Sequence, residues 1–341
     1  MLLLAGLLAG CGKDAEVEAP IRPTIGVVVP LSGPNAAIGE SAVNAVRLAT
    51  GDGFLVLAVD DTLPGAAATL AAKAEVGGVV AHIVRSAAET QVASWLQTDL
   101  PVIVAAPGDY AGVPRIVPPI EDSARCATKL MGPEIFWPRT DGSQAGMRAG
   151  AVLMDTLPRQ ALPMETVDQG SVSGAAARLT GRRARMVVWT GDAAAGGNFV
   201  RVLRGLKVDT PFVGVGMYDS RFLTAAGASA EGALVTSESR PAIDPGFVAA
   251  YERAFGGAPL TSAVDAYDAA LLLIQAWQEE AAAGGPITRE RVKARLPKVV
   301  VNGAGGPMYF DEAGVVRPVV CASFRVTGGR FVIDAVASEA Q

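Results

Sequence analysis

The side chains best suited to hold a ligand lie in short loops that follow apolar runs. Arg85 comes after the apolar residues 79–84, and its guanidinium suits a carboxylate or phosphate group. Ser86 adds a hydroxyl donor, Gly108 lets the backbone approach a ligand, and Tyr110 offers a ring and a hydroxyl group. These residues predict a binding site for an anionic group. The alternative for Arg85 is a solvated loop arginine, because most arginines are exposed.

Residues for catalysis are scarce. The only histidine, His82, ends an apolar run, where a satisfied buried histidine is the simpler interpretation. Asp60 and Asp61 could pair for acid–base chemistry, but neighbours in a strand face opposite sides, which favours a solvated strand end. The sequence has no G-x-S-x-G or G-x-x-x-x-G-K-[ST] motif, and Gly214-Val215-Gly216 lacks the third glycine of a dinucleotide fingerprint. We therefore expect no catalytic residues and no cofactor.

Alternating strands and helices position these loops. Residues 25–29 form an apolar run that predicts a strand buried on both faces, followed by a turn at 31–35 and a helix from Ile38. Further strands are expected at 54–59, 79–84 and 101–106, and further helices at 65–76, ended by Gly77-Gly78, and at 89–97. This alternation predicts a doubly wound parallel sheet, whose ligands bind outside the carboxyl ends of the strands.

The rest of the chain indicates a second lobe. At 341 residues the chain is too long for one ordinary core, and a crossing is expected near 115–122. The pattern of strands and helices is weakest in residues 125–170. Strands are expected at 162–167, 184–189 and 211–215, helices at 143–157, 197–206, 244–255, 262–280 and 288–296, and a hairpin at 319–327 and 330–333. The fold class expected is α/β, with two doubly wound parallel-sheet lobes joined by a multi-strand hinge.

Short motifs follow one another in a fixed order along the chain. They are Pro30-Leu31-Ser32-Gly33-Pro34 with Gly39, Asp60-Asp61, His82-Ile83-Val84-Arg85-Ser86, Thr90-Gln91-Val92-Ala93-Ser94, Pro107-Gly108-Asp109-Tyr110, Glu231-Gly232 and residues 306–314. Together they resemble the leucine/isoleucine/valine-binding protein family, the type I solute receptors of bacterial uptake systems. The resemblance covers about residues 24–334. It implies a periplasmic-binding-protein-like type I fold that closes over a small ligand and does not turn it over.

The resemblance also implies which residues contact the ligand. The family places an acidic residue after the strand at 211–215, where it balances the ligand ammonium. Here Gly216 or Met217 takes that place, with Tyr218 and Asp219 just beyond, and Asp192 lies on the neighbouring loop. Either aspartate could substitute, so the ligand is expected to be amino-acid-like or carboxylate-bearing without being leucine, isoleucine or valine in particular. The ligand-binding residues expected are Ile38, Arg85, Ser86, Gly108, Asp109, Tyr110, Asp192, Met217 and Tyr218.

The amino terminus has the pattern of a bacterial lipoprotein signal. Residues 1–10 are apolar but too few to span a membrane, and Leu8-Ala9-Gly10-Cys11 resembles a lipobox in which Cys11 takes the lipid. No Lys or Arg precedes the apolar core, so either the true start lies upstream or the signal is weak. A frayed apolar end with a chance cysteine is the alternative. Residues 12–23 are charged and contain prolines, which predicts a flexible tether.

Lipidation of Cys11 would leave an even pair of cysteines. Cys126 and Cys321 are both assigned to the second lobe, and an oxidising compartment would let them form a disulfide. There is no C-x-x-C motif and no Cys/His cluster, so no metal site is expected. The net charge of −5 gives no footprint for nucleic acid.

These observations divide the chain into segments and favour one function. We expect a signal and lipid-bearing cysteine at 1–11, a tether at 12–23, an N-terminal lobe at 24–118 and 241–303, a C-terminal lobe at 119–240 and 304–334, and a tail at 335–341. The function expected is that of a monomeric periplasmic or extracytoplasmic lipoprotein, anchored to the membrane through Cys11, which delivers a small ligand to an inner-membrane ABC permease. A periplasmic sensor or regulatory lipoprotein acting on a partner protein is the alternative. An enzyme is a further alternative, which the missing catalytic residues disfavour.

Overall fold

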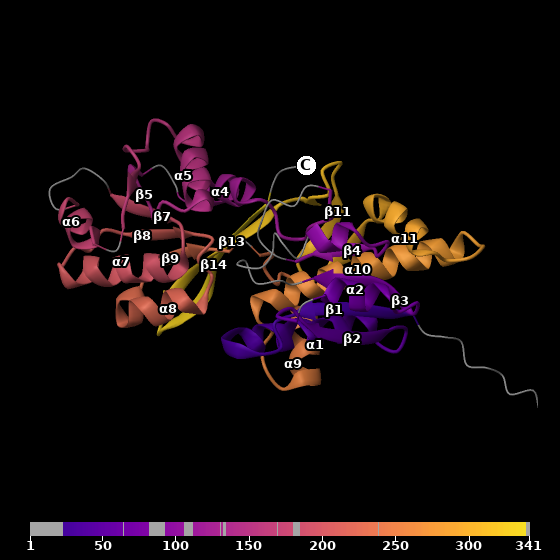
Figure 1. Cartoon of the computed structure of the whole chain (residues 1–341). Helices are drawn as coiled ribbons and strands as arrows, with labels where there is room; N and C mark the ends of the chain where they lie inside the picture. The colour runs from indigo at the N-terminus through magenta and orange to yellow at the C-terminus, as the bar shows by residue number, and fades with distance from the viewer. Residues whose placement is uncertain are drawn as a thin grey trace, which may run out of the picture.

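The chain forms two α/β lobes that lie side by side (Figure 1). The computed structural model describes residues 23–63, 65–81, 93–105, 112–129, 131, 134–168, 170–179, 185–237 and 239–338. Within these residues, no helix is both long enough and apolar enough to cross a membrane.

The first lobe is built on a four-stranded parallel sheet in the order β2-β1-β3-β4. Strand β1 is buried on both faces, as expected: Val27 and Val29 pack with α1 and α10, whereas Val28 packs with α2 on the other side. The elements of this lobe are β1 (Thr24–Val29), α1 (Ala36–Thr50), β2 (Leu55–Asp60), α2 (Ala66–Ala71), β3 (Val76–Ala81), β4 (Val102–Val104), α9 (Pro245–Phe255), α10 (Thr261–Ala282) and α11 (Arg289–Arg295).

The Gly77-Gly78 pair lies inside β3 and does not end a helix, so that expectation was wrong. Helix α2 already stops at Ala71, and β3 begins at Val76. A Cβ on Gly78 would lie 2.8 Å from Leu273 Cδ2 of α10, closer than side-chain atoms approach. The absence of a side chain therefore lets α10 pack directly on the sheet.

The second lobe is built on a seven-stranded sheet in the order β14-β13-β9-β8-β7-β5-β6. The strands from β9 to β6 are parallel, and the β13–β14 hairpin adds antiparallel strands beyond β9. Val188 packs with α4 and α5, whereas Val187 and Trp189 face α6, α7 and α8. The elements are α4 (Ile120–Thr128), β5 (Phe136–Thr140), α5 (Gln144–Thr156), β6 (Glu165–Thr166), α6 (Val172–Ala177), β7 (Met186–Thr190), α7 (Ala193–Gly205), β8 (Phe212–Val215), α8 (Ser220–Ala226), β9 (Leu234–Thr236), β13 (Val320–Thr327) and β14 (Arg330–Ser338).

A small antiparallel sheet of β10 (Val301–Gly303), β11 (Gly306–Phe310) and β12 (Val316–Arg317) belongs with the first lobe. Residues 304–334 were expected in the C-terminal lobe, but Met308, Phe310 and Val316 pack in the same core as α10. The reason is the alternation in β11, which buries Met308 and Phe310 and exposes Tyr309 between them. The second lobe therefore resumes at β13. Strand β14 runs to Ser338, so a tail does not begin at residue 335.

Within the described part of the chain, three segments connect the lobes. The first crossover (residues 112–119) leads from β4 to α4, the second joins β9 to α9, and the third (residues 318–319) joins β12 to β13. Arg317, just before the third crossover, donates to Asp311 in the first lobe and to Asp122 of α4 in the second, both at 2.9 Å. The predicted disulfide between Cys126 of α4 and Cys321 of β13 is present, with the Cα atoms 6.1 Å apart.

Candidate functional site

The carboxyl ends of the parallel strands in each lobe lie at the edge where the chain crosses to the other lobe. In the second lobe, β9 ends at Thr236 and leads straight into the second crossover, and β8, β7 and β5 run parallel to it. In the first lobe, Val104 at the end of β4 pairs in parallel with Arg115 of the first crossover. The two carboxyl edges therefore face each other across the crossovers, which is where open α/β sheets place their ligands.

Aspartates follow β5, β7 and β8 at the second-lobe edge. Asp141 follows β5, Asp192 follows β7, and Asp219 lies between β8 and α8. Asp192 caps α7 by accepting from the backbone N–H groups of Ala194 (2.9 Å) and Ala195 (3.1 Å). Such caps satisfy the free amide groups at a helix start, so these carboxylates have a structural role in addition to any contact with a ligand.

The Asp141 carboxylate ties two of these loops together. Its oxygens accept from the backbone N–H groups of Ser143 (2.9 Å) and Asp192 (2.8 Å). Burial opposes ionisation of Asp141, but the hydrogen bonds from Ser143 and Asp192 outweigh burial and lower its pKa. Asp141 therefore stays ionised and holds the β5–α5 and β7–α7 loops in register.

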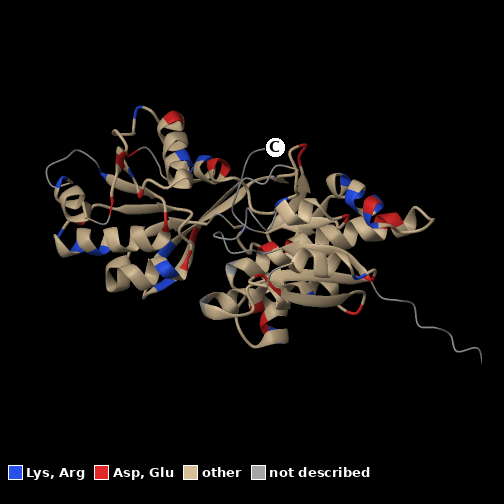
Figure 2. Ribbon diagram, viewed as in Figure 1, with Lys and Arg blue, Asp and Glu red and all other residues tan. Residues whose placement is uncertain are grey.

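Arg221 bridges the other two carboxylates. Its guanidinium donates to Asp219 Oδ2 through Nε (2.9 Å) and Nη2 (2.7 Å), and to Asp192 Oδ2 through Nη1 (3.1 Å). The hydrogen bond with Asp219 is the main cause that raises the pKa of Arg221. The side chain of Arg221 remains 62% exposed at this edge. In the view of Figure 2, basic and acidic residues are interspersed over both lobes.

Met217 and Tyr218 pack into the lobe instead of lining its edge. Met217 is fully buried, and a Cβ on Gly214 would lie 2.5 Å from its Sδ atom, so the sulfur fills the space above β8. A direct contact of the Met217 side chain with a ligand, as the sequence suggested, does not fit this burial. The ring of Tyr218 lies 4.0 Å from that of Phe324 and 4.8 Å from that of Phe331, between centroids. Tyr218 is half-buried and anchors its loop to the β13–β14 hairpin.

Only part of the first-lobe edge lies within the described residues. Ile38 lies half-buried in the first turn of α1, and its carbonyl accepts from Ser262 Oγ at 3.1 Å. Next to it, a Cβ on Gly39 would lie 1.9 Å from the Pro30 carbonyl oxygen, so glycine allows α1 to cross the end of β1. The expected ligand residues Arg85, Ser86, Gly108, Asp109 and Tyr110, as well as His82, lie outside the described residues.

The pair Asp60-Asp61 is split, as expected of strand neighbours, but only one of its members is at a solvated position. Asp60 Oδ1 accepts from the backbone N–H (3.1 Å) and the hydroxyl (3.0 Å) of Thr62. The Thr62 backbone, followed by the hydroxyl of Ser32, lowers the pKa of Asp60. Asp61 is buried, with 4% of its surface exposed. Ser32 and Asp60 thus link the ends of β1 and β2 at the edge of the sheet.

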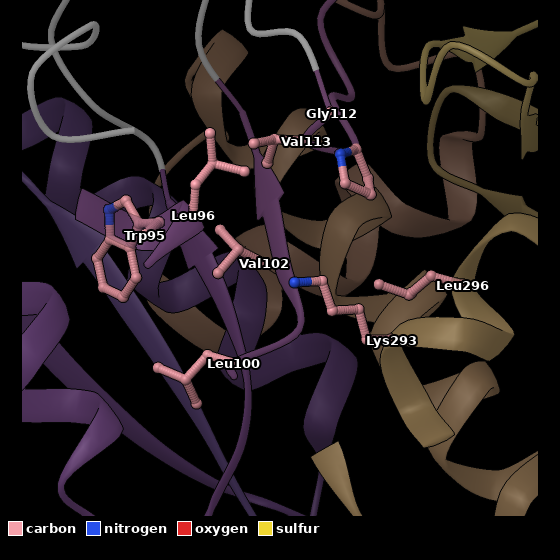
Figure 3. A pocket seen from close by; sticks show the side chains of 9 residues that line it. Trp95, Leu96, Leu100, Val102, Gly112, Val113, Lys293 and Leu296 are labelled. Atoms are coloured by element: carbon pink, nitrogen blue, oxygen red, sulfur yellow. The ribbon is translucent and has the colours of Figure 1, made fainter. Parts of the chain in front are cut away.

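Two pockets occur among the described residues of the first lobe. One is apolar and lies between β4 and α11, where Trp95, Val102 and Leu296 converge with the Lys293 side chain (Figure 3). Its volume of about 20 Å³ accommodates a water-sized molecule and no more. The other, of about 190 Å³, lies at the amino-terminal edge of the first-lobe sheet beside Pro23, Val76 and Trp277. Neither has the position expected for a ligand held between the lobes.

Residues 137–325 match the sequence profile of a family described as periplasmic binding protein. The chain belongs to this family. The match covers more than half of the chain, from β5 through the second and third crossovers to β13. The resemblance to the leucine/isoleucine/valine-binding proteins is thereby confirmed at the level of family and fold.

Solved structures show the same fold for this periplasmic binding protein. Similar chains include the leucine-binding protein LivK of Thermotoga maritima (18% identity, TM-score 0.72, covering 93% of this chain and 99% of that one). A substrate-binding protein of Desulfitobacterium hafniense in complex with Leu has 18% identity and a TM-score of 0.74, covering 92% and 99% of the two chains. A solute-binding protein of R. palustris in complex with benzoate has 18% identity and a TM-score of 0.68, covering 93% and 96%. No curated protein matches the sequence.

The sequence interpretation of this periplasmic binding protein missed Asp141 and Arg221. A signal for both was present: each lies within six residues of the end of a strand, Asp141 in an Asp-x-Ser pattern and Arg221 in an Asp-x-Arg pattern. The sequence did not indicate which residues pair, because Arg221 and Asp141 each bind Asp192, which follows a different strand from theirs. Asp192 was found, but as a partner for a ligand and not as the cap of α7.

Proposed function

We propose that this periplasmic binding protein is the extracytoplasmic solute-binding component of an ABC-type uptake system. Its lobes would close over a small amino-acid-like or carboxylate-bearing ligand. The observation that carries the proposal is that the carboxyl edges of the two parallel sheets face each other across three crossovers. A ligand held between these edges contacts both lobes only in the closed form, and therefore stabilises that form.

The first lobe is proposed to bind the anionic group of the ligand. Arg85 and Ser86 would donate to it, and the loop at 107–110 would supply Gly108, Asp109 and Tyr110. Ile38 would contact the apolar part. This part of the proposal is supported by the order of the motifs in the sequence. Leucine and benzoate, the ligands of two similar structures, share a carboxylate group.

The second lobe would supply polar groups from the loops after β7 and β8. Asp192 is partly exposed there, and its charge is offset by Arg221. This pairing favours a ligand whose second polar group is small or absent over one that needs a free carboxylate from this lobe. We further propose that the protein is exported, anchored through Cys11, monomeric and recognised by an inner-membrane permease. The lipobox-like Leu8-Ala9-Gly10-Cys11 and the family membership support this.

Native mass spectrometry of freshly purified protein tests the binding proposal. We expect an added mass of a small carboxylic acid that is lost on denaturation. Titration calorimetry with the identified compound should then give one site per chain. Accumulation of a product from that compound would instead indicate an enzyme. Uptake of the labelled compound by cells that lack the gene should fall, and unchanged uptake with altered gene expression would favour the sensor alternative.

A further inference from the structure

A charged cluster is buried where the second crossover enters the first lobe. Arg240 is 1% exposed, and Asp265 and Asp268 of α10 are fully buried. The Nε atom of Arg240 donates to Asp268 Oδ2 at 3.2 Å, and its backbone N–H donates to Asp265 Oδ1 at 3.1 Å. Removing three charged groups from water is costly unless they pair closely, so an isolated group would not be tolerated here.

Arg240 also ties two crossovers to the first lobe. Its Nη1 donates to the carbonyl of Pro318 in the third crossover at 3.2 Å, and its Nη2 donates to the carbonyl of Gly305 at 2.6 Å. Arg240 comes only four positions after Thr236, the last residue of β9. If the second lobe rotates, the backbone of this crossover must therefore change conformation within a few residues of Arg240.

The loop between β10 and β11 is shaped around the cluster. Asp268 accepts from the backbone N–H groups of Ala304 (2.6 Å) and Gly305 (3.1 Å). A Cβ on Gly303 would lie 2.2 Å from Asp268 Oδ1, and one on Gly305 would lie 2.6 Å from Arg240 Nε. The backbone approaches the charged atoms this closely because both positions are glycine.

The cluster contains one more carboxyl group than cations. Burial raises the pKa of Asp265 to about 7, despite hydrogen bonds from Ser239 and the Arg240 backbone. Burial likewise raises the pKa of Asp268 to about 6, against the attraction of Arg240. Among the described residues, the charges of Asp268 and Asp244 both act on Tyr267, and neither Tyr267 nor Asp244 adds a positive charge. One bound proton therefore makes the cluster neutral.

We propose that Arg240, Asp265 and Asp268 form a proton-linked pivot, rigid while one of the two carboxyl groups is protonated and looser when both are ionised. The second ionisation leaves an uncompensated negative charge in the interior, next to the carboxylate of Asp268. Water entry and withdrawal of Asp265 from the Arg240 backbone relieve this charge, and both loosen the second crossover. The pivot rests on the lobe movement proposed above. It predicts that the range of lobe orientations widens as the pH rises through neutrality.

A pair of fluorophores, one on each lobe, tests the pivot. Glu252→Cys in α9 and Arg201→Cys in α7 place the dyes on exposed positions of the first and second lobes. In the ligand-free protein, the distribution of transfer efficiency should broaden in a one-proton transition centred near pH 7, the pKa of Asp265. The same pair with Asp265→Asn should stay narrow throughout, because an amide is neutral like the protonated carboxyl group. Asp155→Asn, which changes an exposed carboxyl of α5, should behave like the wild type.

Each outcome decides a different point. A wild type without a pH transition, or an Asp265→Asn variant with the same transition, overturns the pivot. A distribution that is broad at every pH contradicts the pivot but remains consistent with the lobe movement. A single narrow distribution in every variant counts against the lobe movement itself.

Hydrogen exchange of the wild type gives a second measurement if Asp265→Asn does not fold. After correction for the intrinsic rate, protection of the peptide around Arg240 should fall above neutral pH. Protection of β1, which lies in the centre of the first-lobe sheet, should not change over the same range. Equal behaviour of the two peptides contradicts the proposal.

Discussion

Cys126 of α4 and Cys321 of β13 are bonded across 195 residues of sequence, and the bond joins the points where the first and third crossovers enter the second lobe. Both cysteines are buried beside Val319, the residue that ends the third crossover. The bond therefore fixes the distance between the second-lobe ends of the first and third crossovers, so that these ends move together with the second lobe.

Removal of this disulfide should destabilise the protein without abolishing its fold. For Cys126→Ser combined with Cys321→Ser, we expect a loss of roughly 2–5 kcal/mol in the free energy of unfolding, because a long loop in the unfolded chain is no longer closed. Urea unfolding measures the change, and reduced wild-type protein is the matched control. Two free thiols in the denatured, unreduced wild type would show that the bond does not form.

Arg85→Ala should weaken ligand binding and leave stability almost unchanged. A charge-assisted hydrogen bond to a guanidinium contributes roughly 1.5–3 kcal/mol, which corresponds to about a ten- to hundredfold change in affinity. Calorimetry with the co-purified compound is the measurement. Arg201→Ala, at an exposed position of α7, is the control and should bind normally. Full affinity in a folded Arg85→Ala variant would remove Arg85 from the site.

Asp192→Ala should lower stability by about 1 kcal/mol, because it deletes the cap of α7. Asp192→Asn keeps the capping oxygen and removes only the charge that pairs with Arg221, so it should cost less. Comparing the two in urea unfolding separates the cap from the ion pair. In binding, the Asn variant should lose affinity only for a ligand that carries an ammonium group. An equal loss of stability in both variants would contradict the capping role.

Asp265→Asn should change how stability depends on pH. The raised pKa means that the folded state binds more protons than the unfolded state between about pH 4 and about pH 7. This carboxyl group therefore stabilises the wild type fully below that window, and the contribution is lost as the pH rises through it. Urea unfolding at a series of pH values should show that the free energy of unfolding of the variant rises, relative to that of the wild type, from low to neutral pH. A constant difference would mean that Asp265 does not titrate there.

Cys11→Ala should release the protein from membranes. The expectation rests on Leu8-Ala9-Gly10-Cys11 and the polar tether that follows. Fractionation of cells into soluble and membrane parts is the measurement. Ser32→Ala, which changes the first lobe and leaves Cys11 in place, is the control and should remain membrane-bound. Unchanged fractionation of Cys11→Ala would show that the anchor lies elsewhere.

The fold could be predicted largely because its strands are apolar and its turns have strong local signals. The run at 25–29, the turn after it and Asp244 as the cap of α9 are decided by neighbours in sequence, and the structure has them. Gly77-Gly78 was misread because a glycine pair has the same sequence signature whether it ends a helix or makes room for Leu273, 195 residues away. Long-range packing decided that case.

The candidate site was less predictable, because its interactions join loops that follow different strands. Arg221 binds Asp192 across 29 residues, and Asp141 binds the Asp192 backbone across 51. Met217 was placed at the ligand because of its position after β8, whereas glycines at 196 and 214 leave a space in the core that its side chain fills. Position along the chain located the loops but not the direction of the side chains within them.

The pairing of β13 with β9 has a consequence for the order in which the chain can fold. The second lobe draws its central strands from residues 136–236 and its last two from residues 320–338. Until the ribosome has passed Val320, β9 has an open edge and Cys126 has no partner. The hairpin that completes the second lobe is therefore made after the rest of its sheet, and a chain that stops before this hairpin exposes a strand edge of the kind that promotes aggregation.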